Sequence, residues 1–288
     1  MKQKLMLVCL HPIISALNNA KTYLNTKNNW TGTNDIANTF FNKFFYTDDL
    51  HLLSENELKN KISENHEEIN KFIKDNGFNY SIDPLNPGEF ATCSILSILV
   101  QWLKAANSTV NKNELGSYDS IEFEDNFTVF KSKNEFLLKL NTKSSDSVYI
   151  KKLNSKEKEM EFNDVSLVKY CNKLQSNFDE EVYNFSSAII PKLSLNYETD
   201  LEYLNNSTLS RDNDEFKLKK SKQITKFDLD ENGAKVESMY VGVITACSFR
   251  QPEILNIDDD FVIFITRNGL NIPYFSGIIT KEDFKYKK

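Results

Sequence analysis

The chain has 288 residues and a formal net charge of −6 at pH 7. Hydrophobic residues make up 40% of it and include 21 Phe, which is enough to fill a sizeable core, so the composition indicates a globular protein. An acidic chain lacks the clustered Lys and Arg that phosphate binding needs, which argues against a nucleic-acid partner. No run is long and apolar enough to predict a membrane span.

The motifs of common enzymes are missing from the sequence. It has no GxSxG, HExxH, P-loop or dinucleotide-binding fingerprint, and its 8 Gly are too few to suggest a phosphate-cradling loop. The three histidines are too scattered for a zinc site; they are His11, His51 and His66. We therefore expect neither a conventional enzyme nor a bound metal or cofactor.

The cysteines point to a reducing compartment. Four of them lie far apart and form no CxxC pair; they are Cys9, Cys93, Cys171 and Cys247. This spacing is typical of free thiols. The apolar run near the N-terminus is short and is broken at His11 and Pro12, so the signal for secretion is weak. We therefore favour a cytoplasmic location, in a host or in the protein's own cell, over secretion.

The first third of the chain predicts helices and one strand. Residues 11–24 are expected to form a helix, and the aromatic-rich segment 34–45 a strand. Residues Ser54 to Glu57 have the spacing of a helix capping box, so 54–77 is expected to be helical with a break near Asn65.

The next segments predict sheet. After a proline-containing loop, the short and dense apolar run at residues 93–103 indicates a central strand. Residues 121–153 contain short alternating stretches, which are typical of a mixed, mostly antiparallel sheet. Residues 188–206 predict a strand, a turn and a short helix.

The C-terminal segments complete one α+β domain. Residues 217–230 alternate, and one face is made of Gln223, Thr225, Phe227 and Leu229. Residues 261–280 predict two buried strands joined by a turn at Asn268 and Gly269. Because neither a repeat nor a linker divides the sequence, we expect residues 1–288 to form a single domain.

A partial calcium motif lies near the end of the alternating segment. Four residues match the start of an EF-hand loop: Asp228, Asp230, Asn232 and Gly233. The twelfth position of that loop needs a carboxylate, and here it is Met239. The residues before the motif alternate like a strand, where an EF-hand has a helix. We therefore predict no calcium site.

The region from Lys217 onwards resembles the serpin family. KLKKSKQITKFDLDENGA is similar to the strand and hinge that enter the family's reactive-centre loop, with Glu231 and Gly233 at matching hinge positions. DDFVIFITRNGLNIPYFSGIIT is similar to the family's closing strands; it includes Phe261, Phe275 and Gly277. Three upstream segments, DIANTFF, SVYIKKL and IIPKLSL, resemble other serpin strands in the right order. The resemblance thus covers most of the chain from Asn34 onwards.

The resemblance implies an α+β fold with one large mixed sheet, smaller sheets and surrounding helices, of which the N-terminal ones are reduced. In such a fold Asp35–Phe44, Cys93–Val100 and Lys217–Asp230 should be strands of the large sheet. Phe261–Arg267 and Ile272–Ile279 should lie in a second sheet. The resemblance also implies a monomer.

The function that the resemblance implies is centred on residues 233–252, an exposed reactive-centre-like loop for a protein partner such as a serine or cysteine protease. The hinge would comprise Glu231, Gly233, Ala234, Val236 and Ser238. The cleaved bond would join Cys247 to Ser248, counted from the hinge, or Phe249 to Arg250, counted from the closing strands. An inhibitory serpin traps its protease because the cut loop inserts into the large sheet as a new strand.

Three departures from the family pattern bear on that trap. Tyr240 would point under the sheet after insertion, where overpacking costs roughly 1–3 kcal/mol. Gln223 stands where the family has His, and Ser97 is the nearest counterpart of the partner Asn. Two functions therefore stay open: a protease inhibitor, and a non-inhibitory serpin that acts by protein binding, for example as an immunomodulatory protein in a host–pathogen interaction.

Overall fold

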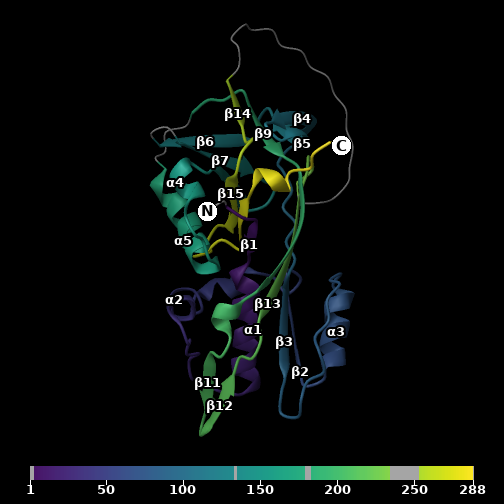
Figure 1. Cartoon of the computed structure of the whole chain (residues 1–288), viewed down its shortest axis with the longest axis vertical. Helices are drawn as coiled ribbons and strands as arrows, with labels where there is room; N and C mark the ends of the chain where they lie inside the picture. The colour runs from purple at the N-terminus through teal and green to yellow at the C-terminus, as the bar shows by residue number, and fades with distance from the viewer. Residues whose placement is uncertain (1–2, 133–134, 179–182, 234–252, 288) are drawn as a thin grey trace.

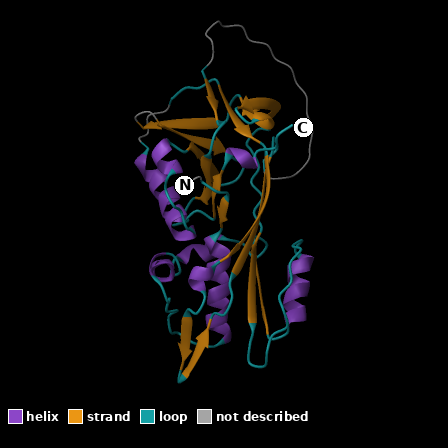
Figure 2. Cartoon of the chain, in the orientation of Figure 1, coloured by secondary structure: helices purple, strands orange, loops and turns teal. Residues whose placement is uncertain are grey.

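The computed structural model describes residues 3–132, 135–178, 183–233 and 253–287 (Figure 1). Its helices are α1 (Leu10–Tyr23), α2 (Asp35–Lys43), α3 (His66–Asp75), α4 (Ser155–Lys158) and α5 (Asp164–Asn177). Its 3-10 helices are η1 (Asp48–Leu52), η2 (Glu202–Leu204) and η3 (Lys281–Asp283). Figure 2 shows most helices outside a strand-rich centre, as expected for the α+β class.

Two sheets occupy the upper part of Figure 1. The larger has the order β1-β16-β15-β8-β7-β6; its strands are β1 (Met6–Val8), β16 (Phe275–Ile279), β15 (Phe261–Arg267), β8 (Asp146–Lys152), β7 (Glu135–Asn141) and β6 (Phe127–Ser132). The other has the order β14-β9-β5-β4; its strands are β14 (Ile254–Asn256), β9 (Ser187–Pro191), β5 (Gly116–Phe123) and β4 (Asn107–Asn113). Only β14 and β9 pair in parallel; the other neighbours in these sheets are antiparallel.

Three antiparallel ladders of two strands complete the described fold. They are β2 (Leu58–Ser63) with β3 (Ala91–Leu96), β10 (Leu193–Asp200) with β13 (Lys222–Leu229), and β11 (Thr208–Arg211) with β12 (Asp214–Lys217). Helices α1 and α3 both pack on β2 and β3 and lie on opposite sides of them (Figure 1). Among the described strands, β3 pairs only with β2 and β13 only with β10.

Strand β15 lies at the centre of the core. Val262 and Phe264 pack into a cluster with α1, α2 and α5, and Phe264 stacks on Tyr149 of β8 with ring centroids 4.9 Å apart. Phe261 and Ile263 pack into a second cluster with residues of the four-stranded sheet. Burial of both faces explains why the sequence of this strand is a continuous apolar run.

Several sequence predictions are confirmed. The segment 121–153 contributes antiparallel strands, and β15 and β16 lie in one sheet with Gly269 in the turn at φ 92°. In β13 every second residue is buried, and the buried set is Gln223, Thr225, Phe227 and Leu229. Period-two burial of this kind is read directly from the sequence.

The strand predicted at Asp35–Phe44 is wrong, because this segment is helix α2. Asn34 caps the helix: its side chain accepts a hydrogen bond from the backbone N of Ala37 at 3.0 Å. Ala37, Phe40 and Phe41 are buried together. Their spacing is that of one face of a helix, and it overrides the strand preference of the aromatic residues.

The helix predicted over residues 54–77 is wrong in its first half. Ser54 and Glu57 do bond reciprocally, with Ser54 N donating to the Glu57 carboxylate at 2.9 Å, but the chain then continues as β2. The helix begins only at His66, where the Asn65 side chain accepts a hydrogen bond from Glu67 N at 2.9 Å.

The single large sheet predicted from Cys93–Val100 and Lys217–Asp230 is also wrong in its detail. Strand β3 ends at Leu96, and beyond it Gln101 and Trp102 form isolated bridges with Gly233 and Thr142. Residue 217 belongs to the β11–β12 hairpin, so β13 begins only at residue 222. The two segments therefore lie in separate ladders.

Candidate functional site at the ends of residues 233–252

A tight turn follows β13 and forms the first end of the site. Asp230 N donates to Gly233 O at 3.2 Å, and the Asp230 carboxylate accepts from Asn232 N at 2.8 Å. Gly233 has a φ of 122°, and a Cβ there would lie 2.4 Å from Val100 O. Glycine alone fits this combination of backbone conformation and close approach.

Trp102 fastens this turn to the segment after β3. Its indole Nε1 donates to Asp230 O at 2.8 Å, and its backbone N lies 3.4 Å from Asn232 O. The side chain is buried and meets Phe123 edge to face, with ring centroids 5.5 Å apart. Trp102 is not among the residues predicted from the sequence; the available signal was an indole in an apolar run, since a buried indole N–H needs an acceptor.

Glu231, a predicted hinge residue, is held by an ion pair. Its carboxylate lies 2.6 Å from Lys192 Nζ, just after β9, and its backbone O accepts from Ala106 N at 2.8 Å. The hydrogen bond from Lys192 is the main reason that the pKa of Glu231 lies below its usual value. The structure therefore anchors Glu231 and Gly233, the two predicted hinge residues that it describes.

Glu253 forms the other end of the site. Ser186 N donates to Glu253 O at 3.0 Å, and the Tyr183 hydroxyl donates to the Glu253 carboxylate at 2.8 Å. Strand β14 follows at once and pairs with β9. The other residues predicted for the hinge and the cleaved bond lie outside the described residues, so they stay predictions; they are Ala234, Val236, Ser238, Cys247, Ser248, Phe249 and Arg250.

Gln223, the residue that the resemblance aligned with a His, ties β13 to the start of α1. Its amide is nearly buried and makes two hydrogen bonds to the backbone of one residue: Cys9 N donates to Oε1 at 3.1 Å, and Nε2 donates to Cys9 O at 2.6 Å. Burial raises the pKa of the Cys9 thiol to about 12, although a hydrogen bond with Thr225 opposes the shift. The position is thus filled by a neutral amide that accepts one hydrogen bond and donates another.

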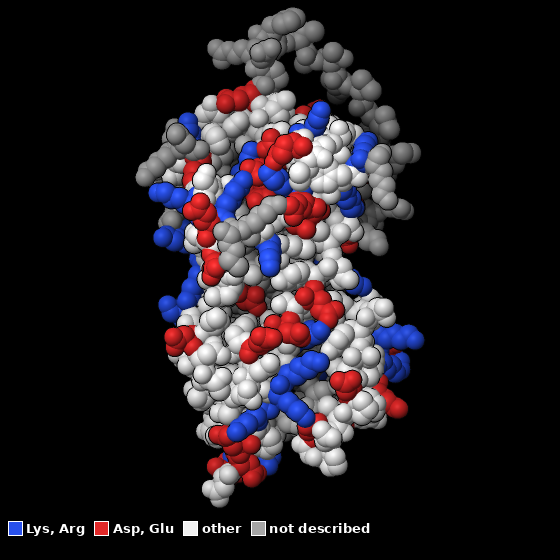
Figure 3. All heavy atoms as spheres, in the orientation of Figure 1, with Lys and Arg blue, Asp and Glu red and all other residues white. Residues whose placement is uncertain are grey.

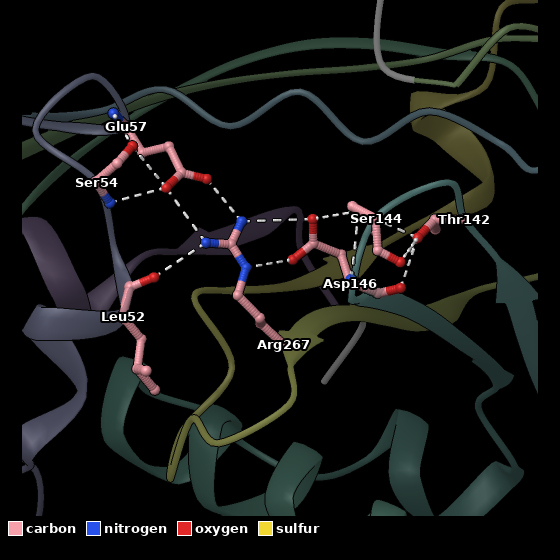
Figure 4. Close-up of polar contacts among 7 residues, drawn as sticks. All are labelled: Leu52, Ser54, Glu57, Thr142, Ser144, Asp146 and Arg267. Atoms are coloured by element: carbon pink, nitrogen blue, oxygen red, sulfur yellow. Dashed lines mark hydrogen bonds and ion pairs between the residues drawn. The ribbon is translucent and has the colours of Figure 1, made fainter.

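Arg267, at the end of β15, joins the six-stranded sheet to the β2–β3 ladder (Figure 4). Its guanidinium lies 2.6 Å from the Glu57 carboxylate and 2.8 Å from that of Asp146, and it donates to Leu52 O at 3.1 Å. Ser144 Oγ donates to the Asp146 carboxylate at 2.6 Å. Hydrogen bonds to Glu57 and Asp146 raise the pKa of Arg267 above its usual value, so the group stays charged.

The similarity of this chain to known proteins lies in its structure and not in its sequence. No protein-family model matches the sequence, and no curated protein matches it. Serpin48 of the insect Tenebrio molitor superposes with a TM-score of 0.61 over 96% of this chain and 92% of its own, at 15% identity. The chain has a serpin fold. Tengpin, a thermophilic serpin in its native state, gives 0.62 over 97% and 89% at 14% identity. Human thyroxine-binding globulin complexed with thyroxine gives 0.60 over 96% and 91% at 12% identity.

In this serpin fold, the turn at Gly233 should require glycine, so replacing this residue should lower the stability of the protein. Gly233→Ala should lower the free energy of unfolding by about 1–3 kcal/mol, because the left-handed φ and the approach to Val100 O both oppose a Cβ. Denaturant unfolding measures the loss. Gly88→Ala is the matched control, since Gly88 also has a positive φ but open space around it. Equal losses in the two variants would contradict the role of the close approach.

The ion pair of Glu57 predicts a dependence of stability on pH. The hydrogen bond from Arg267 is the main reason that the pKa of Glu57 is about 2 rather than the usual 4.5. A carboxyl group with a depressed pKa stabilises the fold above its unfolded pKa, and this contribution is lost as pH falls through the folded pKa. The difference in unfolding temperature between wild type and Glu57→Gln should therefore shrink as pH falls from 4.5 towards 2. A difference that stays constant over that range would contradict this account.

Other described features of the serpin fold concern its thiols, its potential metal ligands, its helices and its surface charge. Cys9, Cys93 and Cys171 are free thiols, and Cys247 lies outside the described residues. Within those residues no cluster of three potential ligands could hold a metal, and the calcium-like residue Asp228 is part of β13. None of the described helices has the length and apolar composition to cross a membrane. Figure 3 shows basic and acidic side chains interspersed over one face of the molecule.

Proposed function

We propose that this serpin-fold protein presents residues 233–252 as a reactive-centre-like loop to a protease or to another protein. The observation that supports this most is the anchoring of both ends. Gly233, after the end of β13, forms a backbone bridge with Gln101, the neighbour of Trp102. Glu253, just before β14, accepts a hydrogen bond at its backbone O from Ser186 N. A segment fixed at two ends by rigid elements can be offered to a partner in a defined orientation. The chain then acts as a protein ligand and not as an enzyme.

Covalent trapping of a serine or cysteine protease is the first form of this function. The hydroxyl or thiol of the protease would add to the carbonyl of Cys247 or of Phe249. The peptide bond then breaks, the new amino group leaves with a proton, and an ester or thioester joins the loop to the enzyme. Mouse protein-Z-dependent protease inhibitor is among the solved structures with this fold, at a TM-score of 0.60 and 12% identity.

A gel assay tests the proposed trap. The protein is incubated with a panel of serine and cysteine proteases and then run under denaturing conditions. The expected result for an inhibitor is a band that survives denaturation at the mass of the protease plus the chain up to the cleaved bond, and sequencing of the released C-terminal peptide identifies that bond. Cleavage within residues 234–252 without such a band would leave loop presentation intact and exclude the trap for that protease. Resistance of the segment to every protease would contradict an accessible loop.

A non-inhibitory binding protein is the second form, and the Gln223 contacts favour it. Two hydrogen bonds fasten β13 to Cys9, so the strand beside which a cut loop would insert is tied to α1. The same fold serves as a binding protein in human thyroxine-binding globulin, which was solved with thyroxine bound. In this form the loop or a neighbouring surface binds a protein partner without being consumed.

Loop cleavage separates the two forms by their thermal stability. We expect a cut between Cys247 and Pro252 to change the unfolding temperature little, because Gln223 holds β13 and Tyr240 is bulky for an inserted strand. Calorimetry of intact and cut protein measures the shift. A large rise would mean that the fold had gained a strand with its hydrogen bonds and buried area, and it would favour the inhibitor.

A further inference from the structure

Strand β4 forms one edge of the four-stranded sheet and lies in the upper part of Figure 1. It spans Asn107–Asn113, and among the described strands it pairs only with β5. Its sequence, NSTVNKN, contains one charged residue, Lys112, and no Pro. Proteins commonly protect an exposed edge with charges, Pro or a bulge, because unpaired N–H and C=O groups can bind another strand. One lysine is little protection for an edge of this length, so β4 can accept a further strand.

The hydrogen bonds of β5 show which backbone groups of β4 point to the free edge. Ser117 O and Asp119 O each accept a backbone hydrogen bond at 2.9 Å from a residue outside β4. Because bonding directions alternate along an antiparallel strand, Tyr118 between them bonds to its register partner Asn111 in β4. The same alternation along β4 leaves the N–H and C=O of every second residue on the free edge; these residues are Ser108, Val110 and Lys112.

This edge is complementary to a second copy of itself. When two β4 strands lie antiparallel with Val110 opposite Val110, Ser108 of each copy lies opposite Lys112 of the other. Each Val110 N can then donate to Val110 O of the other copy, and each Ser108 N to Lys112 O. Within the described part of the chain, the N–H groups of Ser108 and Val110 have no other acceptor, and Lys112 N already donates to the Asn111 side chain at 2.8 Å. A two-fold contact needs this kind of self-complementary surface.

The side chains suit the same register. Val110 is 50% exposed, and at the centre of the contact it would pair with its own copy and remove apolar surface from water. The two Lys112 residues would lie at opposite ends, about 14 Å apart along the strands. That distance exceeds the Debye length of about 8 Å at physiological ionic strength, so the two lysines repel each other little.

Glu231 supplies a charge that complements Lys112 of the other copy. Lys192 Nζ donates to Ser108 Oγ at 2.7 Å and lies 2.6 Å from the Glu231 carboxylate, so Glu231 is close to the Ser108 end of the edge. The Glu231 side chain is 33% exposed. Lys112 of a second copy would lie opposite Ser108 with its side chain on the same face, within reach of this carboxylate. The two-fold axis repeats the arrangement at the other end.

We propose that the β4 edge is a homodimer contact, in which two copies pair antiparallel about Val110 and their four-stranded sheets become one continuous sheet. The contact consists of one short ladder, so the association is weak and reversible, with a dissociation constant in the micromolar range. A dilute sample is then the monomer that the resemblance implies. The association is measured on the protein alone, so it is tested separately from the proposed function.

Analytical ultracentrifugation of the full chain over a range of micromolar concentrations tests the dimer. The average mass of the wild type should rise from that of the monomer towards twice that value. Val110→Lys and Val110→Glu each place like charges directly opposite at the two-fold axis, so each should weaken the association by about fivefold to tenfold. An equal mixture of the two variants should associate again, because Lys then faces Glu. Loss in each variant and recovery in the mixture are expected only when Val110 faces its own copy.

Three further variants control for charge and folding. Met160→Lys adds the same charge at a residue that is 46% exposed and lies outside the sheets, and it should associate like the wild type. Val110→Thr keeps a β-branched side chain and the N–H, so it should also keep the dimer. Val110→Pro removes only an N–H that β5 does not use, and it should abolish the dimer while circular dichroism stays unchanged.

Three results would overturn the proposal. The first is a wild type that stays monomeric at every concentration. The second is a Val110→Lys variant that associates as strongly as the wild type, which would place the contact on another surface. The third is a mixture of the Lys and Glu variants that associates no better than either alone, which would exclude Val110 from the two-fold axis.

Discussion

Arg267→Met should lower the free energy of unfolding by about 3–5 kcal/mol, the usual cost of breaking a buried ion pair from one side. The Arg267 side chain is 16% exposed and joins Glu57 to Asp146, whose side chain is 1% exposed. Without the guanidinium, Asp146 would keep only neutral donors such as Ser144. Leu52 O would also lose its partner, so the connection between β15 and the β2–β3 ladder should weaken first.

Urea unfolding of wild type and variant measures this loss. Arg211→Met is the matched control, because Arg211 pairs with Asp214 at the surface, with side chains 41% and 65% exposed. Such exposed pairs contribute about 0–1 kcal/mol. A loss at Arg267 no larger than that at Arg211 would mean that water satisfies Asp146 in the variant, and that the cluster in Figure 4 is less buried than its contacts imply.

Local sequence patterns were sufficient to predict those strands whose burial follows a simple rule. In β13 the alternation of Gln223, Thr225, Phe227 and Leu229 gave the buried face, since successive side chains point to opposite sides. In β15 the continuous apolar run gave a strand covered on both faces. Both rules use only neighbours in sequence, which is why they succeeded without knowledge of the fold.

The same local patterns failed where two structures suit one sequence. The aromatic residues of α2 fit a strand, and what decides for a helix is the Asn34 cap together with the spacing of Ala37, Phe40 and Phe41. The Ser54–Glu57 box also forms, yet β2 follows it because Leu58–Ser63 can pair with Ala91–Leu96. A capping box favours the start of a helix, but here the tertiary pairing of β2 with β3 overrides that local preference.

The candidate site was predictable only in part for a related reason. The resemblance placed Glu231 and Gly233, because both belong to one continuous segment. Their partners come from far away: Trp102 Nε1 bonds to a carbonyl 128 residues further on, and Gln223 bonds to Cys9 across 214 residues. No local pattern links such pairs, so the sequence could single out Glu231 and Gly233 but could not predict the contacts that hold them.

Gln223→Leu should lower the free energy of unfolding by about 1–3 kcal/mol, because it leaves the N–H of Cys9 without a partner at the start of α1. Leucine is close in volume, so lost hydrogen bonds, not a cavity, should account for the change. Denaturant unfolding measures it, and Asn38→Leu on the exposed surface of α2 is the control, expected within about 0.5 kcal/mol of wild type. The variant also bears on function, since it frees β13 from α1. If cutting the loop raises the unfolding temperature more in Gln223→Leu than in wild type, the amide is what keeps the strand from accepting a neighbour. A loss as small as that of the control would mean that water reaches Cys9 and that the amide does not hold β13.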